Sequence, residues 1–198
     1  ISMKSKNPDS FMFHTPGIEM VKLQSKAFGI PLIEQETKGE KEVELKDLQK
    51  VIEKAKKKYN IKGITTGALY SNYQRERIEK IGDSLGLKVF SPLWHIDQEK
   101  LLREIIENGF RFIITKVAAE GLDKSWLGKE VNSKDIDKLV EINKKIGINI
   151  AFEGGEAETL MIDGPIFSKK IEIEKADIKM ESKICGELLV KKVKLINK

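Results

Sequence analysis

The stretch IKGITTGALYSNYQRERIEKIGDSLGLKVF, residues 61–90, contains a complete strand–helix–strand pattern. Its opening, IKGITTGAL, has the β-branched composition of a strand. NYQRERIEKIGDSLG then places Ile78, Ile81 and Leu85 on one side of a helix, and KVFSPLW is predicted as the next strand. Strands that alternate with helices favour parallel pairing, with the helices packed on the sheet.

The same alternation extends in both directions from this stretch. On the N-terminal side we predict a helix in GIEMVKLQSKAFGIP, a strand in IPLIEQ, and a helix in EVELKDLQKVIEKAKKKY that buries Leu48, Val51, Ile52 and Ala55. On the C-terminal side we predict a helix in DQEKLLREIIENGF, a strand in RFIITKVAAEGLD, a helix in SKDIDKLVEINKKIG and a strand in INIAFE. Beyond Gly164 only strands are predicted. We therefore expect an α/β protein with a parallel, Rossmann-like sheet over residues 1–97 and a smaller mixed α+β domain over residues 98–198.

Composition restricts the classes of function. The chain has 198 residues, of which 40% are hydrophobic and 34% charged, as in a globular protein. No apolar run reaches membrane-spanning length and no signal peptide opens the chain, which favours a cytoplasmic protein without a membrane partner. A single cysteine excludes an internal disulfide, and two distant histidines disfavour a structural zinc site. Abundant Lys, Glu and Ile are typical of a thermophile-like, archaeal-like source.

The net charge of +5 raises the question of nucleic acid. Between Ser168 and Lys198, nine lysines stand against five acidic residues, so the excess lies mostly in this tail. Polar and apolar residues partly alternate there, and edge-strand lysines commonly prevent aggregation. No aromatic residues interleave with these lysines to stack on bases. The tail is therefore predicted to be a solvated sheet face, and nucleic-acid binding is disfavoured.

The segment GALYSNYQRERIE, residues 67–79, is the first of three loops that follow predicted strands, where open α/β sheets bind ligands. Ser71 and Gln74 match a capping box, so the helix is predicted to begin at Asn72. Its free amide groups, with Arg75 and Arg77 nearby, suit an anion. The alternative is an ordinary capped helix with surface pairs such as Arg75 with Glu79.

The other two loops offer different chemistry. In AAEGLDKSWLGKE, Trp126 could line a ligand pocket or simply anchor the loop to the core. In FEGGEAET, residues 152–159, three glutamates surround a Gly-Gly pair that allows close backbone approach. These carboxylates could bind an ammonium group, hold a metal or move protons, or they could belong to a solvated turn.

Three further residues are weaker candidates. His14 and His95 could line a pocket, although a lone histidine is more often structural. Cys185 lies in strand-like sequence without an evident partner base, which disfavours a nucleophilic role. The chain contains neither a Walker motif nor a GxGxxG motif, which disfavours the ordinary P-loop and dinucleotide-binding families.

Taken together, NPDSFMFHT, GALYSNYQRERIE, SPLW, GLDKSWLG and EGGEAET resemble the diphthine–ammonia ligase family, also described as N-type ATP pyrophosphatases or adenine nucleotide alpha hydrolase-like proteins. The resemblance extends from the first residues to about Pro165. It implies a HUP-type nucleotide-binding domain and a substrate-binding domain. It also implies a ligase that converts diphthine on elongation factor 2 to diphthamide with ATP and ammonia, through an acyl-adenylate, and releases AMP and pyrophosphate. Mg²⁺ is the implied counter-ion of the polyphosphate.

The resemblance also implies roles for individual residues. The implied nucleotide contacts are Met3, Gly67, Ala68, Tyr73, Gln74 and Arg75, with Arg75 on a phosphate or carboxylate. The implied catalytic acids are Glu153, Glu156 and Glu158, and the implied substrate contacts are Trp126, Gly154, Gly155 and Thr159. The glutamates would face the trimethylammonium group of diphthine, incoming ammonium or magnesium. No residue is expected to belong to a dedicated protein metal site.

One departure from the family stands out. Its members carry an SGGxDS-type phosphate loop after their first strand, and this chain contains no such motif. We therefore expect the sheet to lack its first strand, loop and helix, about thirty residues, and expect the chain alone to be inactive. Two alternatives stay open: a related ATP pyrophosphatase that modifies tRNA, and a non-catalytic binding module. Whether the chain forms a homo-oligomer also stays open.

Overall fold

The computed structural model describes residues 1–7, 13 and 20–198. The chain forms two compact units, the first made of Ile1–Ile18 and Leu32–Ile96 and the second of Glu19–Pro31 and Asp97–Lys198. His14 and most of NPDSFMFHT lie outside the described residues. The division at residue 97 that we expected from the sequence places the segment 19–31 in the first domain, whereas it packs within the second unit.

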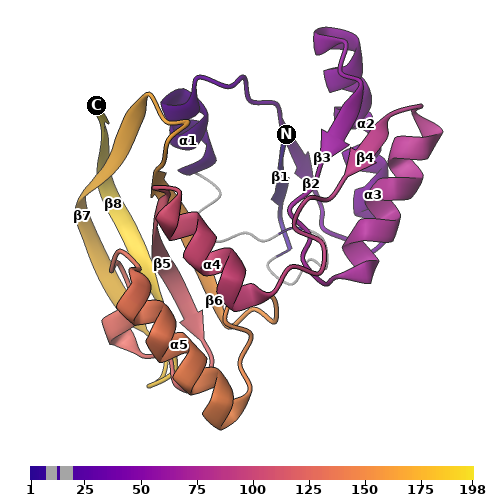
Figure 1. Cartoon of the computed structure of the whole chain (residues 1–198). Helices are drawn as coiled ribbons and strands as arrows, with labels where there is room; N and C mark the ends of the chain where they lie inside the picture. Colours follow the sequence, from indigo (N-terminus) through magenta and orange to yellow (C-terminus); the bar gives the residue numbers. More distant parts are fainter. Residues whose placement is uncertain (8–12, 14–19) are drawn as a thin grey trace. The chain divides into compact units, whose positions relative to one another are not determined.

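The first unit alternates strands and helices. Its elements are β1 (Ser2–Ser5), β2 (Glu34–Thr37), α2 (Val43–Tyr59), β3 (Gly63–Thr65), α3 (Asn72–Ser84) and β4 (Lys88–Phe90), labelled in Figure 1. β1 pairs with β2, and β3 with β4, both in parallel. The predicted parallel α/β pattern is thus confirmed for these pairs. Within the described residues they form two separate two-stranded sheets, so a single Rossmann-like sheet stays a prediction.

The core of the first unit lies between these strands and the two helices. α2 contributes Leu48, Val51, Ile52 and Ala55, the four residues predicted to be buried. Their spacing of three and four residues places them on one face of the helix. From α3, Ile81 is buried and Ile78 and Leu85 pack against the same cluster. The hydrophobic period of the sequence therefore determined which face of each helix points inward.

Gly82 allows α3 to approach β4 closely. A Cβ atom at this position would overlap Cγ2 of Val89 and lie 3.2 Å from the carbonyl oxygen of Leu87. We expect Gly82→Ala to lower the free energy of unfolding by about 1–3 kcal/mol, because overpacking outweighs the better helix propensity of alanine.

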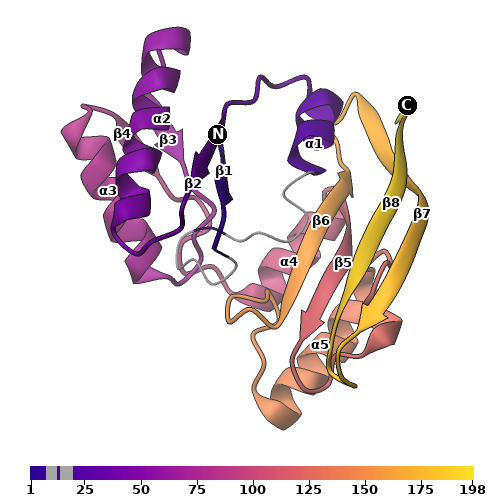
Figure 2. The same cartoon turned by 180° about the vertical axis from the view of Figure 1, so that it is seen from behind.

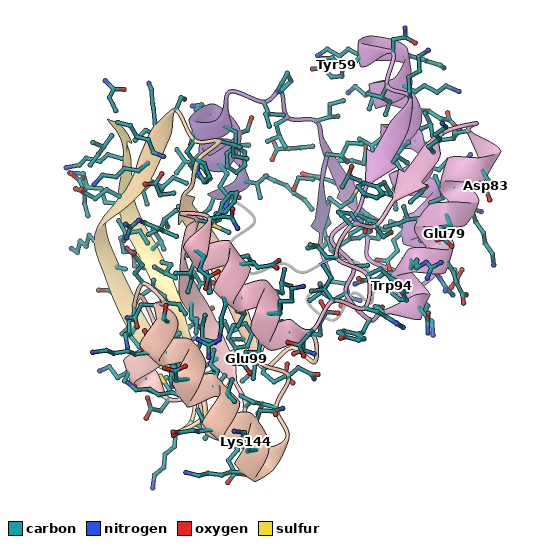
Figure 3. The ribbon with its side chains drawn as sticks, viewed as in Figure 1. Tyr59, Glu79, Asp83, Trp94, Glu99 and Lys144 are labelled. Carbon is teal, nitrogen blue, oxygen red and sulfur yellow. The ribbon has the colours of Figure 1, made fainter. Side chains whose placement is uncertain are left out.

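Chemical denaturation can measure this loss. Asp83→Ala is the matched control, since Asp83 is the next residue of α3 and is exposed (Figure 3). That substitution should leave stability unchanged within about 0.5 kcal/mol. Equal stability of the two variants would show that α3 and Val89 accommodate the added Cβ atom without loss of stability.

The second unit is built on an antiparallel sheet. Its elements are α1 (Val21–Phe28), α4 (Gln98–Glu107), β5 (Arg111–Ala118), the 3₁₀ turn η2 (Lys124–Trp126), α5 (Ser133–Ile146), β6 (Ala157–Asp163), β7 (Lys169–Met180) and β8 (Cys185–Asn197). The strand order is β6-β5-β8-β7, with antiparallel neighbours. The predicted mixed α+β character and the strand-rich sequence after Gly164 are confirmed.

Strand β5 lies within the predicted strand RFIITKVAAEGLD, and its run FII is buried on both faces of the sheet. Phe112 and Ile114 face a core shared with α4 and α5, which cover one face of the sheet in both views (Figures 1 and 2). Ile113 faces the other side, where it packs with Ala27 of α1 and Phe167. Alternate residues of a strand point to opposite faces, so one strand serves two cores.

Two strand predictions were wrong in position or type. IPLIEQ, residues 30–35, was predicted as a strand, but β2 covers Glu34–Thr37. INIAFE, residues 148–153, was also predicted as a strand and contains none; it leads into a turn before β6 begins at Ala157. A short apolar run can serve a buried turn as well as a strand, because period alone does not separate the two.

The basic tail forms the β7–β8 hairpin. Lys192 lies 2.9 Å from Glu174, and Lys194 lies 2.9 Å from Glu172 and 3.0 Å from Glu174. These pairs bridge the two strands across one sheet face, so part of the positive excess is balanced locally. In the described part of the chain, no helix has both the length and the apolar character needed to cross a bilayer.

Candidate functional site

The carboxyl ends of β3 and β4 bring two loops together in the first unit. Thr65 and Phe90 are register partners in the parallel pair, and the amide of Thr66 donates to the carbonyl oxygen of Phe90 at 3.0 Å. The segments that follow the two strands therefore leave the sheet at the same edge. This is the edge at which α/β sheets present ligand-binding residues.

The loop after β3 ends in a helix that begins at the predicted residue, with the Ser71 half of the predicted capping box formed. α3 begins at Asn72, and the Ser71 hydroxyl accepts a hydrogen bond from the amide of Gln74 at 3.3 Å. A Cβ atom added at Gly67 would have no neighbour within 4 Å, so backbone at this point is open to approach. Ala68 is buried, and its amide donates to the Thr66 hydroxyl at 3.3 Å.

Arg75 is held in place on one edge and one face. Its Nε donates to Oε1 of Glu79 at 2.7 Å, which is the surface pair that the sequence left as an alternative. Its guanidinium carbon lies 4.7 Å from the ring centroid of Trp94. In Figure 3, Glu79 lies along α3 and Trp94 beside the start of that helix. Among the described residues, no acceptor bonds to Nη1 or Nη2, so this pair of donors is open to an anion.

Arg75 is one end of a row of stacked planar groups. The Trp94 and His95 rings are 4.6 Å apart at 21°, and the His95 and Tyr70 rings are 5.1 Å apart at 20°. His95 has a φ of 59°, in the left-handed region that non-glycine residues seldom adopt. Strain of this kind is often found at functional sites. We call Tyr70, His95 and Trp94 the aromatic row.

Tyr73 and Arg77 interact with Glu42 at the start of α2. The Tyr73 hydroxyl donates to Oε1 of Glu42 at 3.2 Å, and the Arg77 guanidinium lies 3.4 Å from the Tyr73 ring centroid. The hydrogen bond from Arg77 holds the pKa of Glu42 below its usual value. Burial, with the nearby Glu42 charge, raises the pKa of Tyr73. Arg77 is therefore engaged by its own unit, unlike the Nη edge of Arg75.

Met3 occupies a core position. It lies in β1, is 6% exposed, and packs in the cluster formed with α2 and α3. Its side chain is thus part of the core of the first unit, while its backbone runs along the β1–β2 pair opposite Gln35.

In the second unit, the stretch FEGGEAET forms a turn that enters β6. Glu156 accepts three hydrogen bonds of 2.8 Å each: Oε1 from the backbone and side-chain amides of Asn149, and Oε2 from the amide of Gly154. Both carboxylate oxygens are thus used inside the turn. Glu156 anchors the turn, a structural role that the sequence did not indicate.

The side chain of Gln98 forms hydrogen bonds that hold Asn149 and the backbone beside it. Nε2 of Gln98, at the start of α4, donates to Oδ1 of Asn149 at 3.2 Å, and Oε1 of Gln98 accepts from the amide of Ala151 at 3.0 Å. Two residues of the turn adopt positive φ, Phe152 at 65° and Gly155 at 82°. Together these contacts give the turn one defined conformation. We call residues 149–156, with their Gln98 contacts, the acidic turn.

The other candidate site residues of FEGGEAET flank Glu156 in the chain. Glu153, Gly154 and Gly155 are exposed. Glu158 and Thr159 belong to β6, where they are register partners of Lys116 and Ile114. The Thr115 hydroxyl donates to the carbonyl oxygen of Glu158 at 3.2 Å. Of the three glutamates of this short segment, Glu156 is the one whose carboxylate holds the turn.

Trp126 lies in the core of the second unit. It is 7% exposed and belongs to the cluster of β5, α4 and α5, with Nζ of Lys129 at 5.9 Å from its ring. The structure therefore places its side chain as the anchor of the loop, the alternative that the sequence left open.

The surroundings of Cys185 favour the neutral thiol over the thiolate. Partial burial raises its pKa, and its Sγ donates to Oε2 of Glu181 at 3.5 Å, which raises the pKa further. Because the thiolate is the reactive form, we expect slow alkylation by iodoacetamide at neutral pH, with an onset at higher pH than for a free cysteine. Rates measured against pH should shift to lower pH in Glu181→Gln. An alkylation profile that matches free cysteine would contradict this expectation.

Sequence reasoning missed or undervalued several residues. Gln98 and Asn149 are 51 positions apart, and neither belongs to a motif that marks it. Trp94 and His95 were visible in SPLWH, but only the fold stacks them between Tyr70 and Arg75. Within the described ranges, no three or more His, Cys, Asp or Glu side chains gather in an arrangement that could hold a metal ion.

Two family models match the chain almost from end to end. The model described as the diphthamide synthase N-terminal domain matches residues 1–89, and that described as the diphthamide synthase C-terminal domain matches residues 97–196. The chain belongs to the diphthamide synthase family. The resemblance drawn from EGGEAET and GALYSNYQRERIE is thereby confirmed.

Named relatives of the diphthamide synthase family agree with this assignment. The chain is 36% identical to the human protein named diphthine--ammonia ligase, over 88% of this chain and 69% of that protein. It is 35% identical to the mouse protein of the same name, over 91% of this chain and 72% of that protein. The Schizosaccharomyces pombe protein of that name is 36% identical over 94% of this chain, which spans only 32% of its length.

Proposed function

We propose that the protein containing this chain is a diphthine–ammonia ligase. It would amidate the carboxylate of diphthine on elongation factor 2 to give diphthamide, with ATP and ammonia as co-substrates. The observation that carries this proposal is the 36% identity to the human protein of that name over 88% of the chain. The similarity covers both family domains, one of which contains Arg75 and the other the acidic turn.

The proposed chemistry explains why ATP is required. A carboxylate is a poor acyl donor, so its oxygen would first attack the α-phosphorus of ATP and release pyrophosphate. Ammonia would then attack the carbonyl carbon of the acyl-adenylate, AMP would leave, and one proton would be lost to form the amide. Both steps develop negative charge on oxygen atoms, which positioned cationic donors stabilise.

In the first unit we assign the anionic groups to Arg75. Its open Nη1 and Nη2 donors suit two oxygens of a phosphate or carboxylate. The open space at Gly67 and the capped start of α3 would admit a nucleotide, with Ala68, Tyr73 and Gln74 beside it. Met3 would contribute through its backbone, because its side chain is buried.

In the second unit we assign the cationic partners of the reaction to the acidic turn. Glu156 would keep the turn in shape, because both of its oxygens are engaged. Glu153 and Glu158 would then face the trimethylammonium group of diphthine or incoming ammonium, with Gly154, Gly155 and Thr159 beside them. Trp126 would support the neighbouring loop. Mg²⁺ would arrive with the polyphosphate, which usually supplies several of its ligands.

The test is AMP formation by the full-length protein. We expect AMP only when ATP, ammonium and diphthine-bearing elongation factor 2 are all present, with the amide detected by mass spectrometry of the factor. AMP formation that responds to tRNA and not to elongation factor 2 would favour the tRNA-modifying alternative. No AMP under any condition would favour a binding module. We place the reaction in the cytoplasm, where the factor works.

A further inference from the structure

We infer that Tyr70, His95 and Trp94 are positioning residues that hold the guanidinium group of Arg75 ready for an oxyanion. The ligand class is a carboxylate or phosphate that presents two oxygens. The inference rests on the proposed function for its biological meaning, but the binding it predicts can be measured without that reaction.

Two hydrogen bonds hold Tyr70 and His95, which stack on each other at one end of the aromatic row. The His95 amide donates to the carbonyl oxygen of Leu69 at 2.9 Å, and the Tyr70 hydroxyl donates to that of Ile96 at 2.8 Å. These bonds join the loop after β3 to the loop after β4 in both directions. Tyr70 and His95 therefore cannot move apart without breaking these bonds, and the Trp94 ring stacks on the His95 ring that they hold.

Arg75 lies at the Trp94 end of the row. Arg75 is held through Nε by Glu79 and through its face by Trp94, so its plane is fixed while its Nη edge lacks an acceptor among the described residues. Arg77, two residues along the same helix, donates from Nε and Nη2 to Glu42 and from Nη1 to the carbonyl oxygen of Tyr73. Within α3, only Arg75 is thus both oriented and open.

The arrangement requires an unfavourable backbone conformation at His95. His95 keeps a left-handed backbone conformation, with a φ of 59°, while its ring lies between Tyr70 and Trp94. The strained residue lies just beyond β4, at the sheet edge where ligands bind. A simple surface ion pair between Arg75 and Glu79 would not need this row, because residues four apart on a helix pair without help.

A fixed guanidinium plane favours a particular ligand. Its two Nη donors are parallel and match the two oxygens of a carboxylate or phosphate, which a lysine could not do. An arginine whose rotamers are already restricted loses less entropy on binding. The aromatic row should therefore raise affinity for a bidentate oxyanion without contacting it.

Fluorine NMR of the full-length protein labelled with 5-fluorotryptophan tests this directly. Trp94→Phe assigns the Trp94 signal, and buried Trp126 provides a control signal in the same spectrum. Pyrophosphate and succinate are the two probes, titrated separately. We expect a saturable shift of the Trp94 signal with at least one probe and no shift of the Trp126 signal. The responding probe tells whether the oxyanion is a phosphate or a carboxylate.

A set of variants then separates the roles. Arg75→Ala should abolish the shift, and Arg103→Ala should retain it. His95→Asn keeps a residue that tolerates left-handed backbone but removes the ring, and should weaken binding by about tenfold, the cost of immobilising one long side chain. Tyr70→Leu should do the same, whereas Tyr70→Phe, which keeps the ring but loses the bond to Ile96, should recover part of the affinity. Tyr59→Leu, at another exposed tyrosine of the first unit (Figure 3), should change nothing.

The outcomes separate this inference from the proposed function. An unresponsive Trp94 signal, a shift that survives Arg75→Ala, or wild-type affinity in both His95→Asn and Tyr70→Leu would each overturn the positioning role. If the wild-type protein forms no AMP with diphthine-bearing elongation factor 2 and ammonium, the proposed function fails instead. The titrations still decide the positioning role in that case.

Discussion

Replacing Glu156 by glutamine is expected to lower the free energy of unfolding of the second unit by about 2–4 kcal/mol, since hydrogen bonds to a charged group each contribute about 1.5–3 kcal/mol. The carboxylate accepts from two amides of Asn149 and from the amide of Gly154. A glutamine of the same shape must turn an NH₂ group toward at least one of these donors. The remaining bonds also weaken, because the acceptor is no longer charged.

Chemical unfolding and amide hydrogen exchange both measure this effect. The amides of Asn149 and Gly154 should exchange much faster in Glu156→Gln, because they lose their acceptor. Glu141→Gln is the matched control, since Glu141 is exposed on α5, and should change stability by less than about 0.5 kcal/mol. If the two substitutions are equally mild and exchange at Gly154 stays slow, Glu156 does not anchor the turn.

Removing Arg75 is expected to have the largest effect on the proposed reaction. In the full-length protein, Arg75→Ala should lower kcat/KM for AMP formation by about 10²–10³-fold, the usual loss when one donor to a developing oxyanion is removed. Arg75→Lys should recover only part of this, because an ammonium group carries the charge but not the planar pair of donors. Steady-state kinetics with diphthine-bearing elongation factor 2 would measure both.

Arg103 provides the matched control for Arg75. Arg103 forms ion pairs with Glu99 and Asp137 on the surface of the second unit, so Arg103→Ala should leave kcat/KM unchanged. Unchanged turnover in Arg75→Ala would remove Arg75 from the site. A loss that is as large in Arg75→Lys as in Arg75→Ala would show that geometry, rather than charge, carries the effect.

Local signals in the sequence predicted much of the fold. The start of α3 followed from Ser71 and the buried residues of α2 from their spacing, because caps and helical period depend on residues a few positions apart. The strand β5 was predicted within RFIITKVAAEGLD, although it ends at Ala118. The position of β2 and the turn at INIAFE were not predicted, since four to six apolar residues pack equally well in either conformation.

For the candidate site, residue types and short spacings in the sequence by themselves marked the acidic Gly-Gly segment and the arginine-bearing start of α3. Residue types were sufficient to predict these two segments, because charge and backbone freedom at a loop are properties of its own residues. Which glutamate anchors the turn depended on Asn149, seven positions from Glu156, and on Gln98, which is 51 positions from Asn149. Which arginine stays open depended on Trp94 and Glu42, both in other elements of the first unit. Hydrogen bonds and ring stacking act only over a few ångströms, so tertiary folding alone decided those roles.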